Sequence, residues 1–323
     1  MKLQLGVILT GSVLLLSAVA FGQASLKPNE FEAVKSIGLV DITAPDSSKV
    51  ERVKIGTVYE MGDMKKVDPE AWAKGGGEPK VKPTIFKVTG MKGTARIHQP
   101  GHLGYRTPTI GATYPVGSTV KTERDSFLDL ELSPRNVIRV LPLTEAVIGE
   151  KMRNPGLVSV RLYGGTTDVK LDDFPKDCKF QVSTPMAVCG AVGTAYRTFY
   201  DLNINNAMTF EVEVTDGEVM VFGTLIRVLE KPLHAGQSLR IEVTDQEDVR
   251  LIMARFTGKV GDMLKLMLWG REFHLLIAAP EGVDPNTVTQ GIAQVTLRMA
   301  RPREVVPPVI PAIHDFPSSP AGT

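Results

Sequence analysis

The sequence is poor in the side chains that most often carry chemistry. It has only two cysteines, Cys178 and Cys189, and five histidines among its 323 residues. No histidine with a supporting Asn or Asp stands in a recognisable catalytic pattern, which disfavours a cysteine nucleophile. The sequence therefore predicts a protein that is not an enzyme, with no catalytic residue, no cofactor and no metal site.

An excess of charge of either sign is also missing. Lysine and arginine total 37 against 36 acidic residues, and no block of like charges marks a basic arm or an acidic tail. Binding of DNA or RNA relies on a basic surface that neutralises phosphates. A neutral chain offers no such surface, so nucleic acid is not an expected partner.

Long hydrophobic runs are absent after residue 21. The one long run, residues 5–21, follows the charged Lys2 and leads into small residues, which is typical of a secretory signal peptide. We interpret residues 1–24 as that signal, and we expect a periplasmic or secreted protein with no stable membrane span after cleavage. An uncleaved membrane anchor is the alternative, although the run is at the short limit for a span.

Helical periodicity is weak, whereas alternation of apolar and polar residues is common after residue 84. Because successive side chains of a strand point to opposite faces, this alternation predicts half-buried strands. The clearest examples are residues 127–133, 157–163, 209–214 and 238–243.

Turns and helices are expected at a few places only. Asp216-Gly217 and Gly270-Arg271 lie between alternating runs and predict hairpin turns. One helix is expected near Asn29–Ile37, and a further turn near Pro69–Lys74.

Composition divides the rest of the chain. Residues 25–84 are polar and end in a Gly/Pro/Lys-rich linker, residues 74–83. Residues 85–243 form the main β region, and residues 244–300 a smaller, β-rich C-terminal unit. Residues 301–323 are rich in proline and have too few apolar residues for a core of their own.

An ordered series of motifs in residues 85–243 resembles the FecR-type domain of the ferric-citrate-regulator family, a group of bacterial envelope proteins. The series begins with VTGMKGTARI (residues 88–97), and residues 114–148 follow with Gly117, Val120, Thr122, Ser126 and Pro142 at the family positions. It continues with VRLYGGTTDVKL (160–171), Thr184-Pro185, Ala187-Val188, Gly193-Thr194, VEVTDGEVMVF (212–222) and LHAGQSLRI (233–241).

This resemblance implies an all-β fold with rolled or solenoid-like sheets. Its motif positions in the most informative stretch are Thr184, Pro185, Gly193 and Thr194, and Val192 stands where the family has an arginine. Regulators of the family relay the state of a receptor across the inner membrane to a sigma factor. This chain has the predicted signal peptide where they have a cytoplasmic segment and a membrane span.

That stretch, FQVSTPMAVCGAVGT (residues 180–194), lacks the lysine and the spacing of a phosphate-binding loop. Thr184-Pro185 is expected to end one strand of a hairpin, because proline cannot donate to a β-ladder. Such a hairpin would bring Cys178 and Cys189 close, and an even pair of cysteines in an exported protein suggests a disulfide. Two reduced, buried thiols are the alternative.

The histidines and acidic pairs favour structural roles. His98 and His102 have the i, i+4 spacing of a zinc site, but Pro100 and Gly101 between them exclude a helix, so a solvated loop is expected. The acidic pairs, Asp172-Asp173 and Asp129/Glu131, have no partner that would make one member an acid and the other a base.

Four aromatic residues could form a sugar-stacking surface: Trp269, Phe273, Tyr163 and Tyr196. Positions in the core are the stronger expectation for scattered aromatic side chains.

Two functions of different class remain. The first is an exported, non-catalytic envelope protein whose FecR-like β domain is a binding or scaffold module for a protein partner or a cell-wall polymer. The second is a hydrolase acting on glycan or peptide, which would need two carboxylates about 5–10 Å apart in a groove. A signalling regulator becomes a third reading if the N-terminal segment is an uncleaved anchor.

Overall fold

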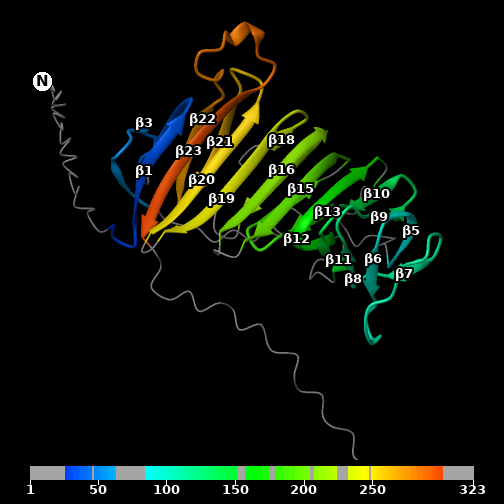
Figure 1. Ribbon diagram of the computed structural model, residues 1–323. Coiled ribbons are helices and arrows are strands. Elements are labelled where there is room, and N and C mark those ends of the chain that lie inside the picture. The colour runs from blue at the N-terminus through cyan, green and yellow to red at the C-terminus, as the bar shows by residue number, and fades with distance from the viewer. Residues whose placement is uncertain are drawn as a thin grey trace, which may run out of the picture.

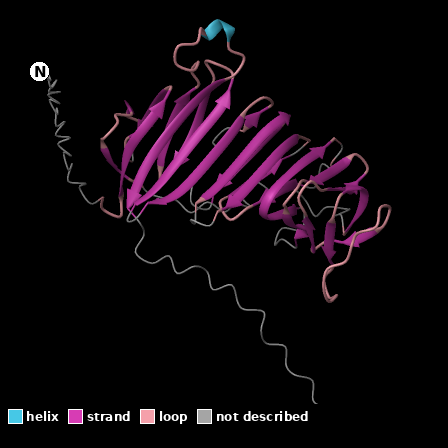
Figure 2. Cartoon of the chain, in the orientation of Figure 1, coloured by secondary structure: helices cyan, strands magenta, loops and turns pink. Residues whose placement is uncertain are grey.

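The computed structural model describes residues 26–45, 47–62, 84–150, 157–172, 174, 179–191, 193–203, 207–223, 232–246 and 249–300. Nearly all regular elements of this part are strands, as Figure 2 shows, and the short 3-10 helix η2 (Pro285–Thr287) is the exception. The predicted all-β fold class is confirmed. Within the described residues, no helix is long and apolar enough to cross a membrane.

Hydrogen bonds connect 19 strands into one sheet, and this sheet forms two layers that share β12 (Leu157–Leu171). The layer called here the long layer is antiparallel throughout. Its order is β7 (Thr113–Pro115), β5 (Ile85–Lys92), β9 (Phe127–Ser133), β10 (Asn136–Val140), the second half of β12, β15 (Ala195–Leu202), β16 (Met208–Asp216), β19 (Ser238–Gln246), β20 (Val249–Gly258), β23 (Gly291–Ala300), β1 (Glu30–Ile37) and β4 (Val58–Glu60) (Figure 1).

The other layer, called here the short layer, contains the first half of β12 and seven further elements. Its order is β6 (Ala95–His98), β8 (Ser118–Thr122), β11 (Glu145–Glu150), β12, β13 (Lys179–Ser183), β14 (Ala187–Ala191), β17 (Glu218–Gly223) and β18 (Leu233–His234). A separate four-stranded sheet has the order β21 (Met263–Leu268), β22 (Arg271–Leu276), β2 (Leu39–Thr43) and β3 (Val50–Arg52).

One hydrophobic cluster contains buried residues of all these sheets. The predicted alternation accounts for it: in β9, Leu128, Leu130 and Leu132 are buried while the residues between them are partly exposed. The same pattern holds for β16 and β19, the strands predicted at residues 209–214 and 238–243. Burial of one face of each strand in a common core is what holds the sheets together.

A cluster of aromatic residues forms the core at one end of the molecule. Phe31 of β1 lies 5.6 Å from Tyr59, 5.0 Å from Trp269 and 6.0 Å from Phe273, measured between ring centroids. The guanidinium of Arg271 lies over the rings of Phe31 and Tyr59, and burial lowers the pKa of this arginine. This cluster fixes N-terminal strands of the long layer against the C-terminal hairpin β21–β22.

A bend at Gly165 allows β12 to pair with strands of both layers. Before the bend, Leu162 pairs with Ala146 of β11, and after it Gly165 pairs with Tyr200 of β15. Gly165 has φ +97°, and a Cβ there would lie 2.5 Å from the Cα of Thr144 and 2.7 Å from the carbonyl oxygen of Leu143. Only glycine fits this conformation and this close approach.

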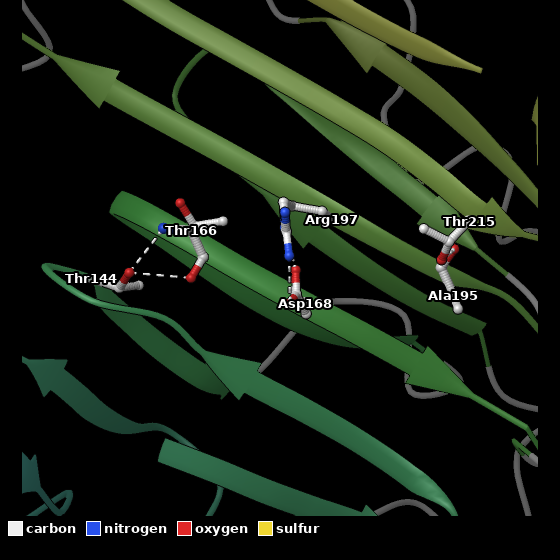
Figure 3. A network of polar contacts seen from close by, with 6 residues as sticks. All are labelled: Thr144, Thr166, Asp168, Ala195, Arg197 and Thr215. Atoms are coloured by element: carbon white, nitrogen blue, oxygen red, sulfur yellow. Dashed lines mark hydrogen bonds and ion pairs between the residues drawn. The ribbon is translucent and has the colours of Figure 1, made fainter. Parts of the chain in front are cut away.

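The hydroxyl of Thr144, which precedes β11, stabilises the bend by hydrogen bonds to the backbone of β12. Its Oγ1 accepts a hydrogen bond from the Thr166 amide at 2.8 Å and donates to the Thr166 carbonyl at 3.1 Å (Figure 3). The side chain thus supplies partners for backbone groups at the point where the strand changes layers.

Three expectations about local structure meet different outcomes. The helix expected at Asn29–Ile37 is wrong, because the segment forms β1, in which Phe31 and Ala33 are buried on one face. The hairpin at Asp216-Gly217 is also wrong: β16 pairs in the long layer and β17 in the short layer, so the turn is a corner between layers. The β21–β22 hairpin is confirmed, but its turn residues are Trp269 and Gly270, both with positive φ, and not the predicted Gly270-Arg271, because Arg271 already pairs with Leu268.

The strands also bear on the expected division of the chain. The expected boundary between residues 243 and 244 lies inside β19. Strands of the polar N-terminal segment join the C-terminal part, since β1 pairs with β23 and β2 with β22. The signal peptide, the turn at residues 69–74, the linker and the Pro-rich tail lie outside the described residues.

We predict that Gly165→Ala destabilises the protein by about 3 kcal/mol or more, because the new Cβ meets backbone atoms and the positive φ is unfavourable for alanine. Gly164→Ala is the matched control, since nothing lies within 4 Å of a Cβ at that position. Denaturant unfolding of both variants checks this. Equal stability of the two would contradict the assigned bend.

Candidate ligand-binding face

Five neighbouring strands of the long layer carry charges of alternating sign at directly paired positions. Asp129 of β9 pairs with Arg139 of β10, which pairs with Asp168 of β12. Asp168 pairs with Arg197 of β15, which pairs with Glu213 of β16. Because these residues alternate with buried ones, they form a row on the outward face of the layer. We call it the charge row.

Two bidentate ion pairs order the row. Arg139 donates from Nε and Nη2 to the Asp129 carboxylate at 2.7 and 2.9 Å. Arg197 donates in the same way to Asp168 at 2.6 and 3.0 Å (Figure 3). Hydrogen bonding to these carboxylates raises the pKa of Arg139 and Arg197, so both guanidinium groups remain charged.

Neighbouring residues make room for the first pair. A Cβ at Gly90 of β5 would lie 2.8 Å from Oδ2 of Asp129, so the small residue leaves the carboxylate free to meet Arg139. Phe127 supports the same arginine, with its ring centroid 4.7 Å from the guanidinium carbon.

The row ends near two arginines that face each other across strands. Arg240 of β19 pairs in register with Arg255 of β20. Arg240 also contacts Glu211 at 3.0 Å and Glu242 at 2.6 Å. The Nε of Arg255 is buried and has no hydrogen-bond partner within the part of the chain that the structure describes. Like charges directly opposite destabilise a sheet, and Glu211 and Glu242 offset this cost because they lie against Arg240.

Two shallow depressions lie along this face. The larger, of about 540 Å³, is bordered by residues that include Asp129, Arg139, Asp168 and Thr215. The smaller, of about 410 Å³, is bordered by Phe199, Glu211 and Arg240, among others. Arg197 and Glu213 border both, so the two depressions are adjacent.

This arrangement offers hydrogen-bond donors and acceptors in alternation, one strand apart, or about 4.8 Å. Guanidinium groups bind carboxylates in a planar fork, and carboxylates accept from amines and hydroxyls. The face therefore suits an extended ligand that carries both kinds of group. Among the described residues, no group of three or more His, Cys, Asp or Glu side chains could hold a metal ion.

The predicted motif positions build turns rather than this face. Thr184 caps the β13–β14 hairpin, because its Oγ1 accepts from the amides of Met186 and Ala187 at 3.2 and 2.9 Å. Pro185 lies in that turn, and the predicted strand ending at Thr184-Pro185 is confirmed. Gly193 and Thr194 form the corner from β14 to β15, where the Thr194 carbonyl accepts from the Leu171 amide at 2.9 Å.

The structure corrects the expected position of Cys189 in the proposed disulfide. Cys189 is a free, buried thiol, and the hairpin register pairs it with Val182. The premise that Cys189 faces Cys178 across this hairpin is therefore wrong, while Cys178 itself lies outside the described residues. Burial raises the pKa of Cys189 to about 12, against a smaller lowering by Thr198.

Most of the other candidates take the structural positions expected of them. His98 Nε2 lies 2.8 Å from the carbonyl oxygen of His102, within one loop. Trp269, Phe273 and Tyr196 are buried as expected, so they do not form a sugar-stacking surface. The core position expected for Tyr163 is wrong, because this residue is 48% exposed.

Three members of the acidic pairs that the sequence suggested are described, and two of them form ion pairs. Asp129 pairs with Arg139, and Asp172 contacts Lys170 at 3.0 Å, whereas Asp173 lies outside the described residues. Sequence reasoning missed the charge row as a whole. Each member is visible as the polar residue of an alternating strand, but the pairing that aligns them comes from the fold.

Comparison with known proteins adds little to this description. No protein-family model matches the chain, and no curated protein matches it. A solved structure from Parabacteroides distasonis, of a protein provisionally assigned as an anti-sigma factor, is similar over 42% of this chain and 58% of that chain, with 15% identity and a TM-score of 0.31. A likeness this weak carries no argument, and the FecR-type resemblance stays a prediction.

We predict that the Cys189 thiol does not react with a thiol reagent in the native protein between about pH 7 and about pH 9, because burial keeps it protonated and inaccessible. The raised pKa also means that the thiol's contribution to stability is present below the unfolded value of about 8.5 and is lost as pH rises toward the folded value. Labelling of a Cys178→Ser variant, with and without denaturant, is the measurement. Fast native labelling that accelerates with pH would contradict the burial.

Proposed function

We propose that the protein is an exported, non-catalytic envelope protein whose β-structure is a binding or scaffold module. The ligand is a protein partner or a cell-wall polymer, and it binds on the outward face of the long layer. The charge row with its two adjacent depressions is the observation that carries the proposal.

The ion pairs of the charge row contribute little to the stability of the fold, but they prepare the row for binding a ligand. Exposed ion pairs contribute about 0–1 kcal/mol each to a fold, so the two bidentate pairs add little to a core of this size. Their bidentate geometry, however, holds the guanidinium planes in one orientation before a ligand arrives. Such preorganisation lowers the entropy cost of binding.

The alternation of sign restricts the ligand's chemistry. A dense polyanion would meet Asp129, Asp168 and Glu213 as well as the arginines, which disfavours nucleic acid. A chain that carries both amines and carboxylates fits better, as in a peptide segment or the peptide part of a cell wall.

The predicted signal peptide and the resemblance to FecR-type domains support an envelope location. The same features leave a signalling regulator as the alternative if the N-terminal segment is retained as an anchor.

A hydrolase is the alternative of a different class. Glu211 and Glu213 are two residues apart on β16 and border the smaller depression, so their Cα atoms are separated by about 6–7 Å. A general acid needs surroundings that disfavour a carboxylate's charge. The cations Arg197 and Arg240 border the same open depression, which favours binding over catalysis.

Arg197→Gln is expected to weaken binding about tenfold or more, because it removes a charged bidentate donor between the two depressions. The measurement uses the full chain with purified peptidoglycan sacculi, and in parallel an envelope extract from which a retained protein is identified. Arg52→Gln is the matched control: Arg52 pairs with Asp41 in the four-stranded sheet, and its side chain is 53% exposed against 51% for Arg197.

The control is expected to bind like the wild type, and both variants to keep its melting temperature. Equal binding of the two variants, or no binding by the wild type in either arm, would contradict the proposed face. Release of soluble fragments from the sacculi would support the hydrolase instead.

A further inference from the structure

The segment that contains β5–β8, at one end of the molecule, differs in charge from the chain as a whole (Figure 1). Residues 84–122 contain no aspartate or glutamate, although acidic and basic residues nearly balance over the full sequence. The basic residues of this segment are Lys87, Lys92, Arg96, Arg106 and Lys121.

Acids from outside the segment pair with only some of these cations. Lys121 contacts Glu145 at 2.9 Å, and Arg96 approaches Glu123 at 3.9 Å. Lys87 lies directly opposite Glu131 of β9, whereas Lys92 and Arg106 have no ion pair with any residue that the structure describes. Lys92 and Arg106 therefore remain as cations of this segment without an acidic partner among the described residues.

The loop between β6 and β7 presents an apolar side chain from this basic segment. Leu103, between Gly101 and Gly104, is 96% exposed, and Tyr105 is 42% exposed. A single exposed leucine is ordinary on a protein surface. Here the leucine and a tyrosine lie on one loop, and its flanking strands carry Arg96 on β6 and no acidic residue.

Several contacts give the loop a defined shape. Ile97 and Arg106 exchange backbone hydrogen bonds of 2.7 and 2.8 Å across its base. The His102 amide donates to the Gln99 carbonyl at 3.2 Å, and the Tyr105 ring lies 5.5 Å from the ring of His98. The Lys121 Nζ is 5.1 Å from the centroid of the Tyr105 ring. The exposure of Leu103 is therefore a property of an ordered loop.

We propose that this end docks on an anionic lipid surface, with Leu103 inserted into the interfacial region of the bilayer. Tyrosine has an apolar ring and a polar hydroxyl, which suits the boundary between headgroups and acyl chains. Unpaired cations behind an apolar tip are attracted by anionic headgroups. The site lies apart from the charge row, and it does not depend on the proposed function.

A lipid surface fits this end better than a protein pocket. Arg106 is exposed at the base of the loop that carries Leu103, so an anionic surface that Leu103 enters can meet this cation as well. One leucine and a few cations predict weak binding that salt reduces.

The test uses the full chain and vesicles of phosphatidylcholine with and without phosphatidylglycerol. Leu103→Ser is expected to lower the affinity for anionic vesicles about tenfold or more, and Arg106→Gln about fivefold. The matched controls are Leu202→Ser, at a leucine that is 54% exposed on β15, and Lys259→Gln, at an exposed lysine. Both controls are expected to bind like the wild type.

A second readout reports on the loop itself, independently of any binding by the N-terminal apolar segment. An environment-sensitive dye on Leu103→Cys, in a Cys178→Ser background, should brighten and shift to shorter wavelength on anionic vesicles only. The same dye on Leu202→Cys should not change.

A dye at residue 103 that does not respond, or that responds equally to neutral vesicles, would overturn the proposal. So would unchanged vesicle affinity of Leu103→Ser. If that variant instead lost a protein identified in the envelope extract, the loop would be a protein-binding element and the lipid proposal would be wrong.

Discussion

The bend of β12 at Gly165 is the constraint on which the rest of the architecture depends. It allows one strand to pair first with β11 and β13 and then with β10 and β15. At the bend, β12 contacts the turn between layers that contains Thr144, through the Thr166 amide. At its C-terminal end, β12 contacts the turn between layers that contains Thr194, through the Leu171 amide. The chain therefore returns to the short layer from the opposite edge, which explains why β12 and β13 are parallel while the other pairs are antiparallel.

The same strand aligns the charge row. Asp168 lies in the second half of β12, and its two register partners, Arg139 and Arg197, come from the strands on either side. A one-residue slip of β12 would turn Asp168 toward the core, and it would expose Thr167 and Val169 on the outward face. The close approach of Gly165 to Thr144 opposes that slip. Fold and candidate site thus share one local cause.

The sequence predicts the strands far better than their partners. Alternation identifies β9, β16 and β19 because each buries one face. It misleads at Asp216-Gly217, since a corner between layers needs the same positive φ as a hairpin turn. The helix predicted at Asn29–Ile37 is the strand β1, in which the alternation of buried and partly exposed residues covers only Phe31 and Ala33. The charge row and the Val182–Cys189 register were out of reach, because they depend on pairing between strands far apart in the sequence, as with Asp168 and Arg197.

The central claim is that β12 joins both layers in one cooperative unit, and hydrogen exchange across a denaturant series tests it most directly. The account predicts that amides of β13–β14 in the short layer and of β15–β16 in the long layer lose protection at the same denaturant concentration, together with both halves of β12. Loss of protection in β13–β14 at a clearly lower concentration than in β15–β16 would contradict it.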